Sequence, residues 1–326
     1  MIVKVIREAQ FRGSFFKLFS LRYICFFFLI AKSFVSHGQN IALHGELKSS
    51  KNNTPIPYAY LILNGKNGTI TNQQGQFKMR VSETDLKDTL LISSIGYKSK
   101  EFQINELVNC NNFNCEIYLE PLSIRLKEVE IKPRKSISNR IGPSYNKDEC
   151  QITQLISLHR LPEQIAIFLQ PKKEAVIKDV GFFIAKEGKP KTAFRIQVYD
   201  RHPKSGLPNK RLLNTNVYAT PKRGNRWVKV GLEEHNIQVP KDGFFIAMEI
   251  LNIGKSGIKI RKFKQYDEEK STLITKLDTT YGAHVNFCRA SENNDYKQFY
   301  FSKQTKCGWL KSSHTYPLIY ATVVYE

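Results

Sequence analysis

Short stretches of alternating apolar and polar residues, separated by turn residues, follow one another along most of the chain after residue 40. Alternation with a period of two is typical of β-strands that bury one face. Up to residue 119 the pattern predicts about seven strands, a number and spacing that indicate a small antiparallel sandwich. The predicted strands are residues 41–47, 58–63, 69–71, 77–81, 89–93, 97–104 and 115–119.

Turn residues separate these strands. Asn64-Gly65 and Asn67-Gly68 are dipeptides typical of tight turns. Gln73-Gln74-Gly75 lies between residues 69–71 and 77–81 and predicts a hairpin that joins these two strands.

The second half of the chain is also strand-like. Residues 202–209 and 235–243 indicate long turns between strands, and residues 164–169 form an apolar run of either helical or strand type. The predicted strands here are residues 176–185, 193–199, 227–232, 243–251 and 317–325. The pattern predicts an all-β protein whose second domain, residues 148–326, is a sandwich of jelly-roll character.

Five short motifs occur in the order found in one known family. They are Gly45, residues 55–59 (Pro-Ile-Pro-Tyr-Ala), residues 68–72, residues 75–77 and residues 93–97 (Ser-Ser-Ile-Gly-Tyr). In this order they resemble carboxypeptidase regulatory-like domains. Residues 126–131 are similar to a segment that often follows this domain in gram-negative envelope proteins, so the resemblance covers residues 41–131.

The resemblance implies a seven-stranded, transthyretin-like β-sandwich over residues 39–121 that has no catalytic role. Asn72 stands where the family more often has Asp, and either side chain can hydrogen-bond to a turn backbone. We interpret the glycines of the motifs as turn positions that need a positive φ. Outer-membrane receptors carry such a domain in front of a plug and a barrel, but the about 195 residues that follow here are too few for both.

The N-terminal segment has the pattern of a secretory signal peptide. Residues 1–22 carry five basic residues and one acidic residue, an apolar run follows at residues 23–31, and Ser36-His37-Gly38 places small residues before Gln39. We therefore predict a signal peptide over residues 1–38, with cleavage after Gly38. The alternative is an uncleaved anchor, but the apolar run is shorter than the about 20 residues that cross a membrane. No membrane-spanning segment is expected in the mature chain.

The charge of the chain is strongly basic and unevenly distributed. Its 50 Lys and Arg against 29 Asp and Glu give a formal net charge of +21. Residues 39–121 are balanced, whereas residues 122–147 carry seven basic and two acidic residues and, with Pro133, Gly142 and Pro143, indicate an exposed linker.

The densest basic run lies in the second domain, at residues 258–264. Lys259, Arg261 and Lys262 belong to it and are candidates for an anion-binding site. The alternative is a strand edge whose charges prevent pairing with other chains. Nucleic acid is not expected as a partner, because export and the absence of a known nucleic-acid motif argue against it. An envelope glycan or another polyanion is the expected partner.

Aromatic residues of the second domain are the other candidates for binding. Sugars pack on exposed aromatic rings, and Tyr199, Tyr218 and Trp227 lie in or beside the expected binding loops. Core packing is the alternative, and it is favoured for Tyr199 and Trp227, which lie within apolar alternation.

Five cysteines remain in the mature chain, and export permits disulfides. We predict a local bridge between Cys110 and Cys115, a second between Cys288 and Cys307, and a remaining thiol at Cys150. A metal site is not expected, because the chain has no Cys-x-x-Cys pair with matching histidines.

No catalytic motif was found. None of the histidines is followed by Glu at the spacing of zinc carboxypeptidases, and neither a nucleophile elbow nor a phosphate-binding loop occurs. The sequence therefore predicts an exported, non-enzymatic protein of the periplasm or cell surface of a gram-negative bacterium, without a cofactor, that binds glycans or anionic polymers. The alternatives are a periplasmic partner of an outer-membrane protein complex and a hydrolase with an unrecognised site.

Overall fold

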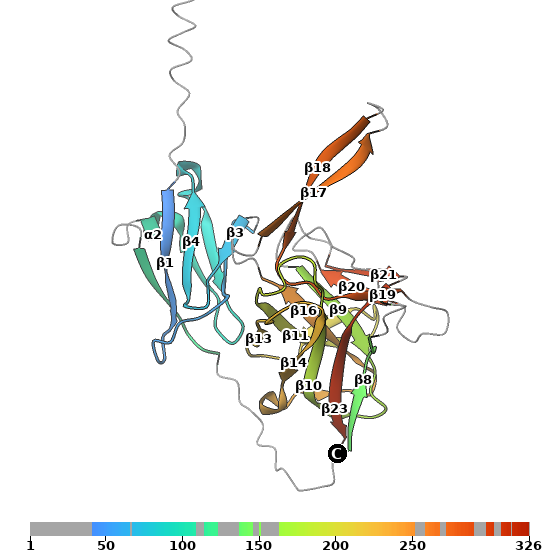
Figure 1. Ribbon diagram of the computed structural model, residues 1–326. Helices are drawn as coiled ribbons and strands as arrows, with labels where there is room; N and C mark the ends of the chain where they lie inside the picture. The colour runs from blue at the N-terminus through green and yellow to red at the C-terminus, as the bar shows by residue number, and fades with distance from the viewer. Residues whose placement is uncertain are drawn as a thin grey trace, which may run out of the picture.

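The computed structural model describes residues 41–65, 67–108, 114–122, 137–145, 150, 163–251, 258–267, 272–289, 298–302, 308–313 and 315–325. The regular secondary structure of these residues is almost entirely β-strand, as expected, and the strands form two units (Figure 1). The predicted signal peptide, residues 1–38, lies outside the described residues. No helix among the described residues is long and apolar enough to cross a membrane.

The first unit consists of a three-stranded sheet of order β4-β1-β7 and a four-stranded sheet of order β3-β2-β5-β6. The strands are β1 (Ile41–Ser49), β2 (Tyr60–Leu63), β3 (Asn67–Ile70), β4 (Gln76–Val81), β5 (Thr89–Ser93), β6 (Lys100–Gln103) and β7 (Asn114–Leu119). A 3-10 turn, η1 (Glu83–Asp85), and a short helix, α2 (Ile104–Val108), connect them. Alternate residues of both sheets face one apolar core, which includes Leu47, Leu61, Phe77, Ile92 and Ile117.

Two of the turn predictions in this unit were wrong. Asn67-Gly68 lies within β3 and pairs with β2, and the turn before it is Asn64-Gly65, where both residues have a positive φ. β3 and β4 do not form a hairpin, because they belong to different sheets. The turn at Gln73-Gln74-Gly75 therefore carries the chain from one sheet to the other. The Asn72 side chain accepts hydrogen bonds from Gln74 N and Gln76 N at 2.9 Å each, so it still stabilises this turn.

The motif glycines serve two purposes. Gly75 and Gly96 have φ values of 75° and 84°, as predicted for turn positions. Gly45 and Gly68 are strand residues with no positive φ. A Cβ atom at Gly45 would lie 2.1 Å from the Cys115 carbonyl oxygen, and one at Gly68 would lie 2.3 Å from the Leu61 carbonyl oxygen. These two positions need glycine because neighbouring backbone approaches them closely.

The second unit packs two sheets against each other. The five-stranded sheet has the order β14-β10-β23-β8, and β15 pairs with β10; the seven-stranded sheet has the order β12-β11-β16-β9-β20-β21, and β13 pairs with β11. The strands of the first sheet are β14 (Arg226–Gly231), β10 (Ala175–Ile184), β23 (Ile319–Tyr325), β8 (Ile137–Ile141) and β15 (Gln238–Val239). Those of the second are β12 (Pro208–Arg211), β11 (Phe194–Arg201), β16 (Phe244–Ile250), β9 (Glu163–Leu169), β20 (Gln298–Ser302), β21 (Trp309–Ser313) and β13 (Tyr218–Ala219).

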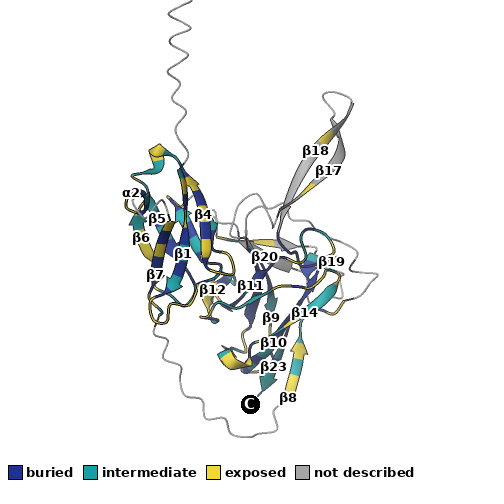
Figure 2. Cartoon of the chain, turned by 60° about the vertical axis from the view of Figure 1, so that its left-hand side comes forward, coloured by how far each residue is buried: buried dark blue, intermediate teal, exposed yellow. Residues whose placement is uncertain are grey.

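A single apolar core fills the space between these sheets. Phe182 and Ile184 of β10 and Ile319 of β23 enter it from one side, and Phe194 of β11 and Phe244 of β16 enter it from the other. Figure 2 shows the buried residues along these strands in dark blue. The strands predicted around residues 176–185, 193–199, 227–232, 243–251 and 317–325 are confirmed, and the apolar run at 164–169 is strand β9.

Two further strand pairs complete the second unit. β17 (Ile258–Asp267) pairs with β18 (Thr272–Tyr281) in a long hairpin that extends away from both sandwiches (Figure 1). β19 (Phe287–Arg289) pairs with β22 (Thr315–Pro317). A 3-10 turn, η3 (Glu233–His235), lies in the connection after β14.

Part of the predicted linker was assigned wrongly. β8 lies within residues 122–147 and pairs with β23 along its whole length, from Ile137 opposite Tyr325 to Ile141 opposite Ala321. Ile141 also packs against the core of the second unit. The prolines, glycines and charges around β8 suggested a linker because an exposed edge strand has much the same composition.

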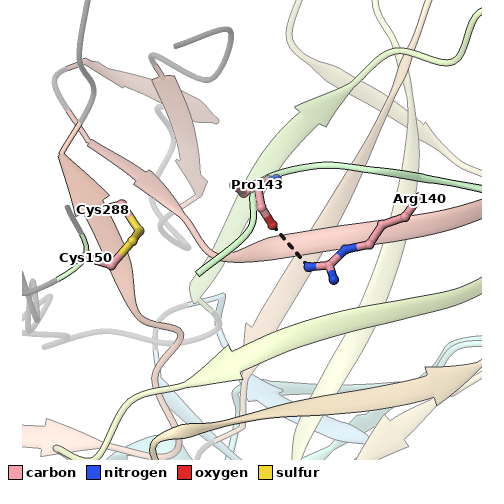
Figure 3. Close-up of a disulfide and its surroundings, with 4 residues drawn as sticks. All are labelled: Arg140, Pro143, Cys150 and Cys288. Carbon is pink, nitrogen blue, oxygen red and sulfur yellow. Dashed lines mark hydrogen bonds between the residues drawn. A yellow bond between two sulfur atoms is a disulfide. The ribbon is translucent and has the colours of Figure 1, made fainter. Parts of the chain in front are cut away.

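The disulfide prediction for Cys288 was also wrong. Cys288 bonds to Cys150, and both residues are buried beside Phe183, Tyr316 and Leu318 (Figure 3). This bond connects the stretch between β8 and β9 to β19, so Cys150 is not the remaining thiol. Cys110 and Cys307 lie outside the described residues. The predicted pair of Cys110 with Cys115 is therefore not tested, although Cys115 is buried with its sulfur 3.0 Å from the Leu107 carbonyl oxygen.

Candidate functional site

The two units meet at a group of buried and partly buried polar side chains on the outer face of the seven-stranded sheet. Arg195 of β11 lies directly opposite Glu249 of β16, which lies opposite Gln164 of β9. These positions alternate with core residues, so the row points away from the sandwich core and towards the first unit. We call this group the interunit cluster: Gln164, Arg195, Gln197, Tyr199, Asn216 and Glu249 of the second unit with Pro57, Tyr58 and Tyr60 of the first.

Arg195 is the centre of the cluster. Only 1% of its side chain is exposed, and its Nη1 donates to Glu249 Oε1 at 2.7 Å, where 2% of the glutamate side chain is exposed. Its Nε donates to Asn216 Oδ1 at 2.7 Å, and its Nη2 donates to the Tyr58 carbonyl oxygen of the first unit. Each guanidinium nitrogen thus has an acceptor, as a buried cation requires.

The Glu249 carboxylate accepts hydrogen bonds from both units. Its Oε2 accepts from Gln197 Nε2 at 2.6 Å and from Gln164 Nε2 at 3.3 Å, and its Oε1 also accepts from the Tyr60 hydroxyl of the first unit. Tyr199 extends the network by donating its hydroxyl to Gln164 Oε1 at 2.7 Å. The carboxylate therefore lies in a shell of donors from both β sandwiches.

A second polar contact joins the turn before β2 to the second unit. Asn216 Nδ2 donates to the Pro57 carbonyl oxygen at 2.9 Å. Tyr58, the next residue, has φ 54°, a left-handed conformation that is uncommon for a large side chain. Its ring meets Tyr218 edge-to-face, with 4.8 Å between the ring centroids, and packs with Ala193 and Leu251 of the second unit. The contacts with the second unit hold a backbone conformation that costs about 1–3 kcal/mol.

The electrostatics of the cluster favour one protonation state. Loss of water around its hydroxyl raises the pKa of Tyr60 well above its ordinary value, and the nearby Glu249 charge raises it further. Burial lowers the pKa of Arg195, but the Glu249 carboxylate and Tyr60 outweigh burial and raise it overall. At neutral pH the cluster therefore holds a cationic Arg195 and a neutral Tyr60. Neither group can take up or release a proton there, so the cluster is suited to joining the units rather than to acid–base chemistry.

We expect the folded protein to lose stability at alkaline pH through Tyr60. Its pKa in the folded state lies above the ordinary 10.0, so the unfolded chain loses the phenolic proton first. The contribution of Tyr60 to the free energy of unfolding is constant below pH 10, where the phenol is protonated in both states, and it falls as pH rises above the ordinary pKa of 10.0. Tyr60→Phe removes this titration, so the free energy of unfolding of the variant should fall less steeply above pH 10 in urea titrations. Tyr325→Phe, which removes a phenol outside the cluster, is the control; equal slopes for Tyr60→Phe and the wild type would contradict the prediction.

The predicted basic site lies on the β17–β18 hairpin. Lys259, Arg261 and Lys262 are residues of β17, opposite Thr280, Asp278 and Leu277 of β18. Among the described strands, β17 pairs only with β18, so these three residues belong to the part of the molecule that extends away from the sandwiches. The side chain of Ile260, between them, is 64% exposed.

The three predicted aromatic residues are not brought together. Tyr199 is 7% exposed and belongs to the interunit cluster, and its ring contacts Trp309 edge-to-face. Tyr218 packs against Tyr58 of the first unit. Trp227 lies on the five-stranded sheet. Core packing therefore explains Tyr199, whose burial leaves its ring no open face for a sugar.

Sequence reasoning missed Arg195, Gln197 and Glu249. The signal was present: Arg195, Gln197 and Tyr199 alternate with Phe194, Ile196 and Val198 of the core, and Glu249 lies within the otherwise apolar strand β16. Such alternation normally indicates a face in contact with water. Only the position of the first unit shows that this polar face is buried.

The part of the chain that the structure describes contains no group of three or more His, Cys, Asp or Glu residues placed to hold a metal ion.

Comparison with known proteins identifies the domain family of the first unit. Residues 43–131 match the family model described as the CarboxypepD_reg-like domain. The first unit is a carboxypeptidase regulatory-like domain. No curated protein matches the chain. Among solved structures, a protein from Bacteroides fragilis NCTC 9343, named provisionally as membrane-associated and of unknown function, is similar at 8% identity over 88% of this chain and 98% of its own, with a TM-score of 0.20. That TM-score is too low to support an argument about the second unit.

Proposed function

We propose that this chain is an exported, non-catalytic binding module of the gram-negative cell envelope, in which the second unit engages an anionic polymer. The β17–β18 hairpin carries the proposal, because it combines the densest basic run of the sequence with a position away from both sandwiches (Figure 1). The interunit cluster supports it by joining the carboxypeptidase regulatory-like domain firmly to the unit that bears the hairpin.

Two further observations support export and the fold classes within this proposal. The Cys150–Cys288 bond is of a kind that persists in oxidising compartments such as the periplasm or the cell surface. Three strands facing four in the first unit support a transthyretin-like sandwich, and the two packed sheets of the second support a jelly-roll class.

A charge-deletion experiment tests the anionic partner. We expect the mature protein to bind heparin and alginate, with an affinity that falls as salt is raised, because charge-led binding is screened by ions. The triple variant Lys259→Gln, Arg261→Gln, Lys262→Gln should bind on the order of tenfold more weakly at low salt. Binding is measured by surface plasmon resonance at two salt concentrations.

A matched variant separates position from charge. Lys204→Gln, Lys210→Gln, Lys222→Gln removes the same charge from exposed residues of the second unit outside the hairpin. Equal losses in the two triple variants would contradict a role for the hairpin, and an absence of binding to either polymer would contradict the anionic partner altogether.

A protein partner in an outer-membrane complex is the second candidate. The exposed Ile260 favours it, because a large apolar side chain on an extended hairpin suits burial against another protein. In that case, cross-linking from the envelope should capture a protein through the hairpin, and the interaction should persist at high salt.

A further inference from the structure

The outer face of the five-stranded sheet carries a second group of aromatic and cationic side chains, whereas the interunit cluster lies on the outer face of the seven-stranded sheet. Arg140 of β8 lies opposite Thr322 of β23, Tyr320 of β23 lies opposite Gly181 of β10, and Trp227 of β14 lies opposite Phe183 of β10. These positions alternate with core residues such as Phe182 and Ala321. They therefore share the face of the sheet that points away from the core.

The Arg140 guanidinium lies over two aromatic rings. Its guanidinium carbon is 3.8 Å from the centroid of the Tyr320 ring and 5.0 Å from that of Trp227. Nη2 donates to the Pro143 carbonyl oxygen at 3.3 Å, the hydrogen bond drawn in Figure 3. A guanidinium has five N–H donors, and among the described residues no carboxylate pairs with Arg140, which is exposed. Most of its donors are available to a ligand.

The rings that hold Arg140 are themselves fixed. A Cβ atom at Gly181 would lie 2.0 Å from Tyr320 Cε1, so the glycine leaves room for the ring to lie over β10. Tyr320 is 8% exposed and meets Trp227 edge-to-face at 4.9 Å between centroids. Because its two supports are packed in place, the guanidinium loses little conformational freedom when it binds a ligand.

The aromatic surface continues beside the guanidinium. Trp227 meets Phe183 edge-to-face at 5.4 Å, and Tyr145 stacks on Phe183 with 4.4 Å between centroids and 6° between ring planes. The Tyr145 side chain is 39% exposed. The buried Cys150–Cys288 bond belongs to one apolar cluster with Phe183 and Trp227. A ligand that contacts Arg140 would thus have an aromatic surface next to it.

A second cation lies on the same face. Lys229 of β14 lies opposite Gly181, its side chain is 62% exposed, and its Nζ is 3.1 Å from Asp179 Oδ2. The Asp179 carboxylate balances the charge of Lys229. Asp179 is itself buried and also accepts a hydrogen bond from Thr322 Oγ1. Arg140 therefore remains the cation on this face that has no acidic partner among the described residues.

We propose that this face binds an acidic sugar residue, with the sugar carboxylate on Arg140 and the apolar face of the ring against Trp227 and Tyr145. A guanidinium accepts a carboxylate in a planar, bidentate arrangement, and the carbon-bound hydrogens of a pyranose pack on aromatic rings. The aromatic row favours a sugar acid over a simple anion, because a simple anion would use Arg140 alone. The site goes beyond the proposed function, since it uses neither the hairpin nor a long polymer.

The test uses tetragalacturonate as the probe and maltotetraose as its neutral counterpart. Trp227 is one of two tryptophans in the chain, so binding beside it should change the tryptophan fluorescence, and calorimetry measures the affinity. We expect tetragalacturonate to bind and maltotetraose to bind much more weakly. Arg140→Gln should weaken tetragalacturonate binding at least about tenfold, as expected for the loss of a charge-assisted pair of hydrogen bonds.

Two variants keep the result specific. Arg140→Lys retains the charge but not the planar fork, so it should recover only part of the affinity. Lys204→Gln removes an exposed charge elsewhere in the second unit and should change nothing. The proposal is overturned if tetragalacturonate does not bind, if Arg140→Gln binds it as tightly as the wild type, or if a peptide with a free terminal carboxylate binds more tightly than the sugar.

The hairpin variant distinguishes this site from the proposed function. The triple variant Lys259→Gln, Arg261→Gln, Lys262→Gln should bind tetragalacturonate normally, whereas Arg140→Gln should keep most of its affinity for heparin. If the hairpin variant loses both ligands, there is no separate site on the sheet face.

Discussion

Arg195→Met is expected to lower the free energy of unfolding by about 3–5 kcal/mol. The substitution keeps most of the side-chain volume but leaves the Glu249 carboxylate buried without its cation. Two hydrogen bonds to neutral groups are lost as well, to Asn216 Oδ1 and to the Tyr58 carbonyl oxygen. Guanidinium chloride titration of the mature protein measures the change. A large loss is expected because removing one partner of a buried ion pair leaves the other charge without compensation. This costs far more stability than replacing both partners with neutral side chains.

The double variant Arg195→Met, Glu249→Gln identifies the source of that loss. With the carboxylate also removed, no buried charge remains in the interunit cluster, so the double variant should be more stable than the single one despite carrying more changes. Arg223→Met, an exposed arginine on a loop of the second unit, is the control and should stay within about 0.5 kcal/mol of the wild type. A loss below about 1 kcal/mol for Arg195→Met would show that the pair is not desolvated in solution.

The same cluster predicts how the two units unfold. Arg195 holds the Tyr58 carbonyl oxygen and Glu249 holds the Tyr60 hydroxyl, so the cluster couples the two sandwiches. We expect a single transition in the wild type. In Arg195→Met the first unit should unfold in a transition of its own, before or after that of the second unit, because domains joined by weak interfaces unfold independently.

The fold was largely predictable because each strand carries its own signal. β5 has the bounds that alternation predicts, residues 89–93, and β10, residues 175–184, differs from the predicted 176–185 by one residue at each end. In β5 apolar residues enter the core of the first unit at every second position. In β10 they enter the core of the second unit with the same period on either side of an irregularity between Ile177 and Asp179. The hairpin prediction at residues 73–75 was wrong because a turn signal is local. It shows that the chain reverses direction, but not whether the next strand joins the same sheet.

The candidate sites depend on contacts between distant parts of the chain, and these were not predictable. Nothing in the sequence indicates that the turn at Tyr58 covers Arg195, which is 137 residues away. The sequence pattern predicted a linker at Arg140. Its contact with Tyr320 and Trp227 could not be predicted, because it depends on β8 lying beside β23. Trp227 was a candidate because of its residue type and its position near the expected binding loops, whereas the fold places it beside the Arg140 guanidinium.

The cysteines show the same limit. Proximity in sequence suggested Cys288 with Cys307, whereas the fold joins Cys288 to Cys150 across 138 residues. The order of strands, with β23 between β8 and β10, brings the two ends of this long segment together. A bond that closes so long a loop removes much conformational freedom from the unfolded chain.

The variant Cys150→Ala, Cys288→Ala is therefore expected to lose about 3–5 kcal/mol of unfolding free energy. Most of the loss should come from the unfolded state, because the bond closes a loop of well over a hundred residues; the rest comes from the cavity left beside Phe183 and Tyr316. Urea titration in oxidising buffer measures it. The wild type with a strong reductant should approach the stability of the variant, while the variant itself should respond to reductant much less than the wild type. A variant as stable as the oxidised wild type would mean that strand pairing alone holds this part of the sheet in place, so the aromatic row beside Arg140 would not depend on the Cys150–Cys288 bond.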